Sequence, residues 1–214
     1  MAEPDVIMAT RTILLIRHGA TKLNNDDVSV DRIRGWKDIP LSKDGREEAH
    51  KLGVKLMADK PGYLFCSDLK RAAETAQIIS KIIDVPVSKQ SKMFRPWDVG
   101  DYAGQLSKDA IPQLAYHAEF APSVSLPNGE SFDDFRSRFF SGLQHILAQY
   151  PGKVAIVTHH RDERLLTAWE KAGFPDNGDI DIGTFNRKGE HTGAVMTVKI
   201  PMSKLNSIGV ENAA

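Results

Sequence analysis

Apolar residues gather in short uninterrupted runs along the chain, TILLI at 12–16, GYLFCS at 62–67 and GKVAIVTH at 152–159. Continuous runs of aliphatic and β-branched residues are typical of strands that are covered on both faces of a sheet. DVPVSKQS at 84–91 predicts a further short strand, and TGAVMTVKI at 192–200 predicts the last one.

Between these runs, apolar residues recur every three or four positions, which predicts amphipathic helices. The four segments are LSKDGREEAHKLGVKLMADKP, DLKRAAETAQIISKII, ESFDDFRSRFFSGLQHILAQY and RDERLLTAWEKAG. Ser42 and Ser131 stand where N-cap residues of the first and third helices belong. The alternation of strands and helices predicts one α/β sandwich with a largely parallel sheet.

A chain of 214 residues suits a single domain of this class. We expect the domain at 12–200, with an N-terminal tail at 1–11 and a C-terminal tail at 201–214. The less regular segment at about 93–130 contains four prolines. We interpret it as a loop-rich excursion that serves as a lid or a binding loop.

Charge and composition narrow the classes of partner. Lys plus Arg equal Asp plus Glu at 28 each, so no global field attracts nucleic acid or an anionic membrane. We expect neither as a partner, and we expect a cytoplasmic protein because no segment reads as a signal peptide or a membrane span. The single Cys66 lies in an apolar run, which favours a buried, inert thiol.

Three of the predicted strands end in residues that suggest chemistry. Arg17 and His18 follow the first strand, Arg71 follows the second, and His159 and His160 follow the strand at 152–159. Ligands of open α/β sheets bind beyond the carboxyl ends of the strands. If these strands are neighbours, the histidines and arginines meet at one rim of the sheet.

Such a cluster suits a phosphoryl group. Guanidinium groups bind its oxygens through paired donors, and an imidazole with a pKa near about 6.5 is a nucleophile at neutral pH. Each residue also has a plainer interpretation, since a strand-end histidine or an arginine on a helix often only faces solvent. His159 and His160 are poor joint metal ligands, because adjacent residues of a strand point to opposite faces.

Six motifs then identify a family. RHGAT at 17–21, SDLKRAAETA at 67–76 and VTHH at 157–160 resemble the histidine phosphatase superfamily, also called phosphoglycerate mutase-like. Three further segments resemble its intermediate motifs in the expected order, GWKDIPLSKDG, VGDYAG and PNGES. The resemblance covers residues 12 to 200. It implies a three-layer α/β/α sandwich that forms a phosphohistidine and needs no metal or other cofactor.

The resemblance also assigns roles by position. His18 is similar to the family nucleophile, and His159 is similar to the second histidine of its pocket. Arg17 and Arg71 resemble the phosphate-binding arginines. The resemblance further implies that three polar residues line the phosphate or the substrate entrance, Thr21, Asn24 and Arg34.

Two departures from the family pattern leave the proton donor open. Pro96 stands where one branch has a glutamate that serves as general acid and base, and proline cannot transfer a proton. Asp98 is the nearest alternative donor, although it is equally well explained as a turn carboxylate. His160 replaces a common glycine and is either a donor or a packed neighbour. Asp162 and Glu163 are further candidates, but a helix start also explains them.

We therefore expect a metal-independent phosphatase that acts on a small phosphorylated substrate. A phosphoglycerate mutase is the alternative enzyme, although the segment at 108–127 contains no arginine to enclose a triose acid. A phosphate-binding pseudoenzyme is the third hypothesis. The resemblance suggests a homodimer, and the sequence defines neither the natural substrate nor the oligomeric state.

Overall fold

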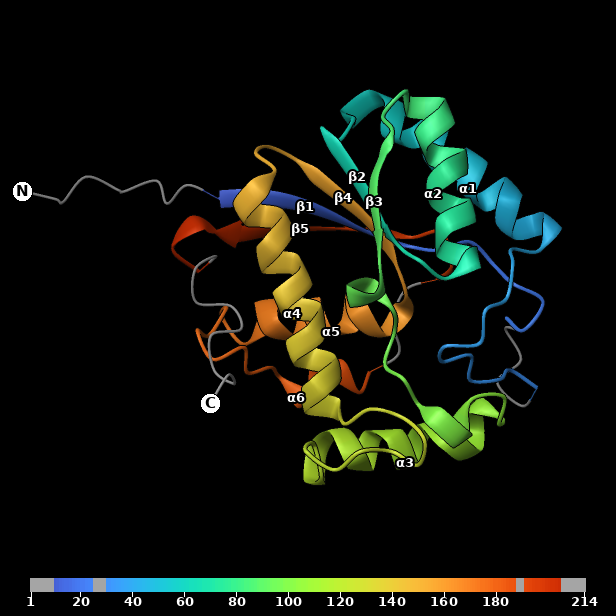
Figure 1. The fold of residues 1–214 in the computed structure, drawn as a ribbon, viewed down its shortest axis with the longest axis vertical. Helices are drawn as coiled ribbons and strands as arrows, with labels where there is room; N and C mark the ends of the chain where they lie inside the picture. Colours follow the sequence, from blue (N-terminus) through green and yellow to red (C-terminus); the bar gives the residue numbers. More distant parts are fainter. Residues whose placement is uncertain (1–9, 25–29, 188–190, 205–214) are drawn as a thin grey trace, which may run out of the picture.

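Five strands form one sheet in the computed structural model, which describes residues 10–24, 30–187 and 191–204. The strands are β1 (Thr10–Arg17), β2 (Tyr63–Ser67), β3 (Val87–Ser91), β4 (Val154–Thr158) and β5 (Val195–Pro201). Their order is β3-β2-β4-β1-β5 (Figure 1). Every pairing is parallel except that of β5 with β1, which confirms the prediction of a mostly parallel sheet.

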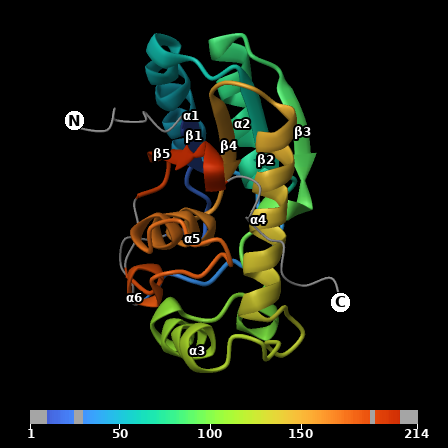
Figure 2. The ribbon, with the colours of Figure 1, turned by 90° about the vertical axis from the view of Figure 1, so that its left-hand side faces the viewer.

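Helices cover both faces of this sheet. They are α1 (Lys43–Leu56), α2 (Lys70–Ile83), α4 (Phe132–Gln149), α5 (His160–Lys171) and the short α6 (Ile182–Phe185). Leu14 and Ile16 of β1 pack toward α1 and α2, whereas Ile13 and Leu15 pack toward α4 and α5. Side chains alternate across a strand, so continuous apolar runs feed two cores. The three-layer α/β/α arrangement is confirmed (Figures 1 and 2).

The sheet register places the predicted chemistry at one rim. β1 and β4 are parallel neighbours, and Arg17 is paired with Thr158 at their carboxyl ends. The next residues along the two strands are His18 and His159, so the two imidazoles emerge side by side. Both expected N-caps are present, since Ser42 accepts a hydrogen bond from the backbone of Gly45 and Ser131 accepts one from Asp134.

The segment at 93–130 differs from its expected loop-rich structure. It contains α3 (Ser107–Phe120), a helix of 14 residues, beside short 3₁₀ turns at Lys92–Phe94 and Gly100–Tyr102. Ala110, Leu114 and Ala118 recur every four residues on its buried side. Pro112 lies inside the helix and removes only one backbone donor. Figures 1 and 2 show α3 at the end of the molecule beyond α4 and α6.

The first and last strands of the sheet extend slightly beyond residues 12 and 200, the predicted domain bounds. β1 begins at Thr10, so two residues of the expected N-terminal tail belong to the sheet. β5 ends at Pro201 and a 3₁₀ turn, Met202–Lys204, follows it. The remainder of both expected tails lies outside the described residues. In the ranges that the structure covers, no helix has the length and apolar character needed to cross a membrane.

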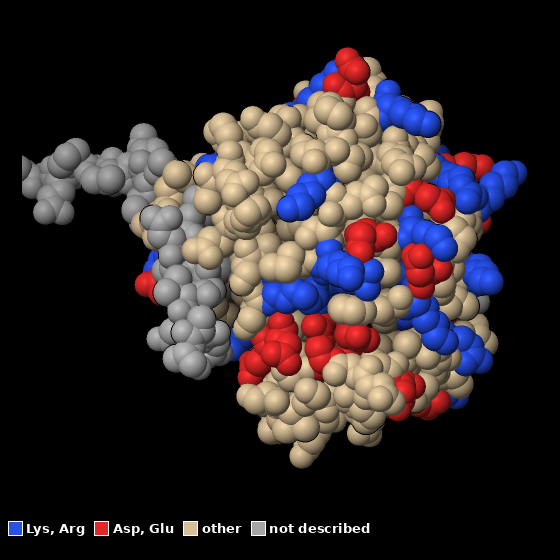
Figure 3. Space-filling view, viewed as in Figure 1, with Lys and Arg blue, Asp and Glu red and all other residues tan. Residues whose placement is uncertain are grey.

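The distribution of surface charge and the burial of Cys66 are those expected from the sequence. Basic and acidic side chains are interspersed across the face seen in Figure 3, as balanced charge predicts. Cys66 is buried in β2, and this burial raises the pKa of its thiol to about 12. The thiol therefore stays protonated at neutral pH and is a poor nucleophile, as its apolar sequence context predicts.

Candidate active site

Two imidazoles occupy the rim where β1 and β4 end. The backbone N–H of His18 donates to the carbonyl of Thr158 at 3.0 Å, which ties the first loop to the neighbouring strand. The rings of His18 and His159 meet edge to face, with centroids 5.1 Å apart. His18 is only 3% exposed and His159 only 2%. The site is therefore shielded from water on the side of the sheet.

Hydrogen bonds fix the tautomer of His18. Its Nδ1 lies 2.7 Å from the carbonyl oxygen of Gly19. Because a carbonyl oxygen only accepts, Nδ1 carries the hydrogen and Nε2 keeps a lone pair. Nε2 accepts a hydrogen bond from Nε of Arg71 at 3.3 Å. Burial, and next the charge of Arg71, lower the pKa of His18 well below 6.5, so the ring is neutral at neutral pH.

Arg71 comes from the first turn of α2 and is held on three sides. Besides His18, its guanidinium donates to the carbonyl of Lys37 at 2.8 Å and to that of Gly35 at 2.9 Å. It is 1% exposed, and burial lowers its pKa to about 9, which still leaves a cation at neutral pH. A guanidinium has five donors, so the three contacts leave further N–H groups for an anion.

Gly19 is required for close packing next to His18. Its N–H donates to Oγ1 of Thr75 at 3.1 Å. A Cβ at this position would lie 2.2 Å from the carbonyl oxygen of Gly45, in the first turn of α1. The glycine thus allows α1 to pack against the loop that carries His18.

His159 and Arg17 complete the polar core of the site. Burial, and next the charge of Arg71, lower the pKa of His159 well below 6.5. Among the described residues neither nitrogen of this ring has a hydrogen-bond partner, so the neutral imidazole has an N–H donor available. Burial lowers the pKa of Arg17, and the carboxylate of Glu163 opposes that shift. The ring of His159 contacts that of His18, and the charge of Arg17 lowers the pKa of His18.

The other predicted phosphate-site residues, Thr21, Asn24 and Arg34, are held by local contacts, and their role at the substrate entrance stays a prediction. Thr21 donates from its backbone and from its hydroxyl to Oδ1 of Asn24, which turns the amide nitrogen of Asn24 away from Thr21. Arg34 forms an ion pair with Asp31 at 3.0 Å and donates to the carbonyl of Leu23. The charge of Arg34 nevertheless acts on His18, Arg17 and Arg71, because it lowers the pKa of each.

The two predicted proton donors have different surroundings. Burial, and next the charge of Arg17, lower the pKa of His160 to about 2, so this ring is neutral and has no surplus proton at neutral pH. Asp98 lies in a turn, where its carboxylate accepts from the N–H of Gly100 at 3.2 Å. Its backbone N–H and carbonyl are both bonded to Glu130. The role of each as proton donor stays a prediction.

An ion pair that sequence reasoning missed fixes the loop around Pro96. Arg138 of α4 binds both carboxylate oxygens of Glu130, at 2.6 and 3.1 Å. The same guanidinium donates to four backbone carbonyls, those of Lys92, Met93, Arg95 and Pro96. The carbonyl of Pro96 also accepts from the indole of Trp36 at 2.8 Å. One branch of the family carries a glutamate in this segment. Here Arg138 and Trp36 hold the segment by hydrogen bonds to its backbone carbonyls.

Asp162, one of the further candidates, is a fully buried carboxyl group. Oγ1 of Thr158 lies 2.8 Å from its Oδ2 and 3.0 Å from the carbonyl oxygen of Phe94. The hydroxyl has one hydrogen and the carbonyl only accepts, so both contacts are satisfied when the acid donates to Thr158. Burial raises the pKa of Asp162 well above 3.8, which agrees with a protonated acid.

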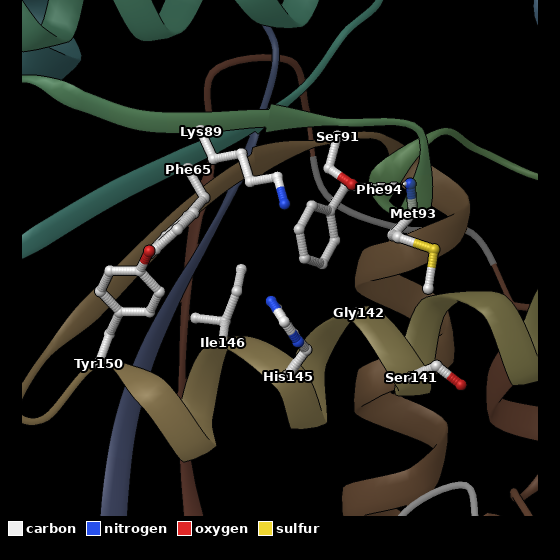
Figure 4. Close-up of a pocket in the computed structure, with 10 residues that line it drawn as sticks. All are labelled: Phe65, Lys89, Ser91, Met93, Phe94, Ser141, Gly142, His145, Ile146 and Tyr150. Carbon is white, nitrogen blue, oxygen red and sulfur yellow. Dashed lines mark hydrogen bonds between the residues drawn. The ribbon is translucent and has the colours of Figure 1, made fainter.

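A separate cavity of about 300 Å³ lies between α4 and the β2–β3 edge of the sheet. Figure 4 shows Lys89 and His145 pointing toward each other across it, with Phe65 and Ile146 on one side and Phe94 on the other. None of the predicted site residues lines it. The candidate chemistry is thus at the carboxyl-end rim, not in this hollow.

Comparison with known proteins identifies the family of the chain. Residues 13–182 match the sequence model of the histidine phosphatase superfamily, branch 1. The chain belongs to this superfamily. Its solved relatives include a mycobacterial glucosyl-3-phosphoglycerate phosphatase, with a TM-score of 0.73 over 94% of this chain and 95% of that one. At 23% identity this likeness shows a shared fold.

Histidine phosphatases of more similar sequence include enzymes of two kinds by name. Phosphoglycerate mutase-like protein 4 of Arabidopsis thaliana is 32% identical over 154 residues, and the metal-independent phosphoserine phosphatase of the same plant is 31% identical over 154. Both alignments cover 69% of this chain, and 65% and 63% of the relatives. The uncharacterized phosphatase PhoE of Bacillus subtilis is 28% identical, over 69% of this chain and 70% of that protein.

Proposed function

We propose that this histidine phosphatase hydrolyses a phosphomonoester through a phosphohistidine on Nε2 of His18, without a metal. The observation that carries the proposal is the fixed tautomer of His18. Its Nδ1–H donates to Gly19 and its neutral Nε2 faces the guanidinium of Arg71, so a lone pair meets a cation at a buried rim. Nucleophilic attack on phosphorus needs both groups in this arrangement.

In the first step, the Nε2 lone pair of His18 attacks phosphorus. The N–P bond forms as the bond from phosphorus to the ester oxygen breaks, and that oxygen leaves with the bonding electrons and takes a proton. The Nε–H of Arg71 transfers its hydrogen bond from Nε2 to a phosphoryl oxygen, which frees the lone pair. Arg17 and the N–H of His159 stabilise charge on the other oxygens.

In the second step, water attacks the phosphorus of phosphohistidine. The N–P bond breaks, its electrons return to Nε2, and the proton of the water passes to the group that earlier protonated the leaving oxygen. Throughout, Nδ1–H of His18 stays on the carbonyl of Gly19, where it disperses the positive charge that develops on the ring. The neutral nucleophile is thereby regenerated.

Release of phosphate from p-nitrophenyl phosphate, with and without a chelator, tests this proposal. We expect activity that the chelator leaves unchanged and that His18→Ala abolishes. Brief incubation with ³²P-labelled substrate should label the protein in an acid-labile, alkali-stable form, as expected of phosphohistidine. Label on another residue, or full activity in His18→Ala, would contradict the mechanism.

Mutase activity is the second candidate, because curated relatives include phosphoglycerate mutases. One from Mesorhizobium japonicum is 30% identical over 190 residues, or 82% of this chain. Exchange between 2- and 3-phosphoglycerate, primed with 2,3-bisphosphoglycerate, distinguishes the two reactions. Rapid exchange with little phosphate release would favour the mutase. Binding of the phosphoglycerates without either reaction would favour a pseudoenzyme.

A further inference from the structure

Two arginines of α5 lie beside the site with no acidic partner in the described part of the chain. Arg161 and Arg164 follow the second histidine by two and five residues, and neither forms an ion pair or a hydrogen bond with a carboxylate of the described residues. Nε and Nη2 of Arg164 are buried without a hydrogen-bond partner. Arg164 is only 9% exposed.

Both guanidiniums are held over the same aromatic ring. The guanidinium carbon of Arg161 lies 5.4 Å from the ring centre of Phe185, and that of Arg164 lies 5.6 Å from it. Arg161 also lies 5.9 Å from the ring of Trp97. Stacking on aromatic faces orients a guanidinium but leaves the N–H groups in its plane free to bind an anion.

This pair is adjacent to the phosphate-binding residues. The charges of Arg17, Arg164 and Arg161 all act on the imidazole of His160. His160, the first residue of α5, is therefore near both Arg17 and the arginine pair. Glu163, on the same turn of α5, acts on Arg17. No carboxylate contributes to the pKa of Arg164, which burial and the charge of Arg161 lower to about 9.

Arg164 is buried and lies beside the half-buried Arg161, and within the described ranges no carboxylate pairs with either, an arrangement of like charges that is costly in a folded protein. Such an arrangement persists where a ligand supplies the missing charge. We propose that Arg161 and Arg164 form a second anion subsite, which binds an acidic group of the substrate next to the phosphate at Arg17 and Arg71. The substrate is then a phosphomonoester with a carboxylate or a second phosphate. This inference rests on the proposed function for the position of the first phosphate.

The names of relatives agree with such a substrate class, since phosphoserine and phosphoglycerate both combine a phosphate with a carboxylate. The subsite also removes the objection that the protein lacks arginines to enclose a triose acid. The segment at 108–127 has no arginine, but α5 supplies two from a part of the chain that is distant in sequence.

Matched ligand pairs test the subsite. 3-Phosphoglycerate and glycerol 3-phosphate differ by a carboxylate in place of a hydroxymethyl group, and fructose 1,6-bisphosphate and fructose 1-phosphate differ by one phosphate. We expect the acidic member of one pair to have a kcat/KM at least about 10-fold higher, and which pair responds identifies the second group. Equal values within both pairs would overturn the proposal.

Variants assign any preference to the two arginines. Arg164→Gln and, separately, Arg161→Gln should reduce the ratio of kcat/KM for the acidic and neutral members about 10-fold. Arg46→Gln is the matched control, because Arg46 is exposed and paired with Glu74 across α1 and α2. We expect its ratio to equal that of the parent. An unchanged ratio in both α5 variants would overturn the assignment.

Equilibrium binding separates this inference from the proposed reaction. Calorimetric titration of His18→Ala with 3-phosphoglycerate and with glycerol 3-phosphate needs no turnover. A preference for the acid that is lost in His18→Ala/Arg161→Gln supports the subsite even if the parent releases no phosphate. The same titration is made with fructose 1,6-bisphosphate and fructose 1-phosphate. If His18→Ala binds the two members of each pair equally well, and the parent does release phosphate, the subsite is overturned and the phosphatase is not.

Discussion

Three buried neutral histidines should make the protein sensitive to mild acid. The pKa values of His18 and His159 lie well below 6.5, and that of His160 is about 2, in each case chiefly because burial disfavours the charged ring. In the unfolded chain these rings protonate near their ordinary value. Between pH 6.5 and 5.5, the unfolded state therefore binds protons at three positions that the folded state leaves neutral.

The sign and size of the effect follow from proton linkage. Each histidine lowers the free energy of unfolding by about 1 kcal/mol between pH 6.5 and 5.5, so the three together lower it by about 3 kcal/mol. Asp162 acts in the opposite direction, because burial raises its folded pKa and the folded state keeps a proton that the unfolded chain releases. That carboxyl offsets about 1.4 kcal/mol at most, which leaves a net loss of about 1.6 kcal/mol.

Urea unfolding at pH 6.5, 6.0 and 5.5, followed by tryptophan fluorescence, measures this loss. His160→Gln removes one of the three groups, so the loss over the same interval should shrink by about 1 kcal/mol. His50→Gln, on the exposed side of α1, is the control and should keep the parent dependence. Constant stability from pH 6.5 to 5.5 in the parent would refute the reasoning that these imidazoles are buried and neutral.

Three further predictions concern single residues. Arg71→Lys keeps a charge but loses the fork that binds Gly35, Lys37 and His18, and should lower kcat/KM for p-nitrophenyl phosphate at least about 100-fold. Gly19→Ala places a Cβ against the carbonyl oxygen of Gly45 and should lower the free energy of unfolding by about 1–3 kcal/mol. Gly62→Ala is the control and should change it little, because the nearest atom to its Cβ is the carbonyl oxygen of Lys153 at 3.6 Å. Asp162→Asn should slow hydrolysis of alkyl phosphates more than that of aryl phosphates, whose leaving groups need less protonation, and equal slowing would remove Asp162 from the donor role.

The sheet and its rim could be predicted because their signals are local. The apolar runs that form β1, β2 and β4 are typical of buried strands. The residues that follow these runs lie at the carboxyl-end rim of the sheet. His18 and His159 come together because β1 and β4 are parallel neighbours, a pairing that the sequence analysis could state only as a condition. The same reasoning missed α3, because proline was given more weight than the four-residue recurrence of Ala110, Leu114 and Ala118.

Side chains that join distant segments could not be found in this way. Arg138 and Glu130 each look like a helix-face charge in sequence, and only the folded chain shows that their ion pair binds the loop at 92–96. Arg161 and Arg164 did carry a signal, since two arginines three apart at the start of a helix that follows the second histidine face the same end of the sheet. Their lack of an acidic partner depends on packing against Phe185, which no local pattern contains.

The surroundings of the two aspartates suggest how a phosphatase of this kind works with Pro96 in place of a glutamate. Asp98 would enter the site only if its three hydrogen bonds to Glu130 and Gly100 broke, at a cost of roughly 1 kcal/mol each. Asp162 lies in the first turn of α5, where its backbone N–H donates to the carbonyl of His159, and it is near enough to Arg71 to influence the pKa of that guanidinium. To protonate a leaving oxygen, its carboxyl would have to break one hydrogen bond, the one to Thr158. A buried acid that already holds its proton is the form that a leaving oxygen requires. The residue that replaced the family glutamate therefore need not lie in the segment where the glutamate was lost, and α5 can supply both the proton and the second anion subsite.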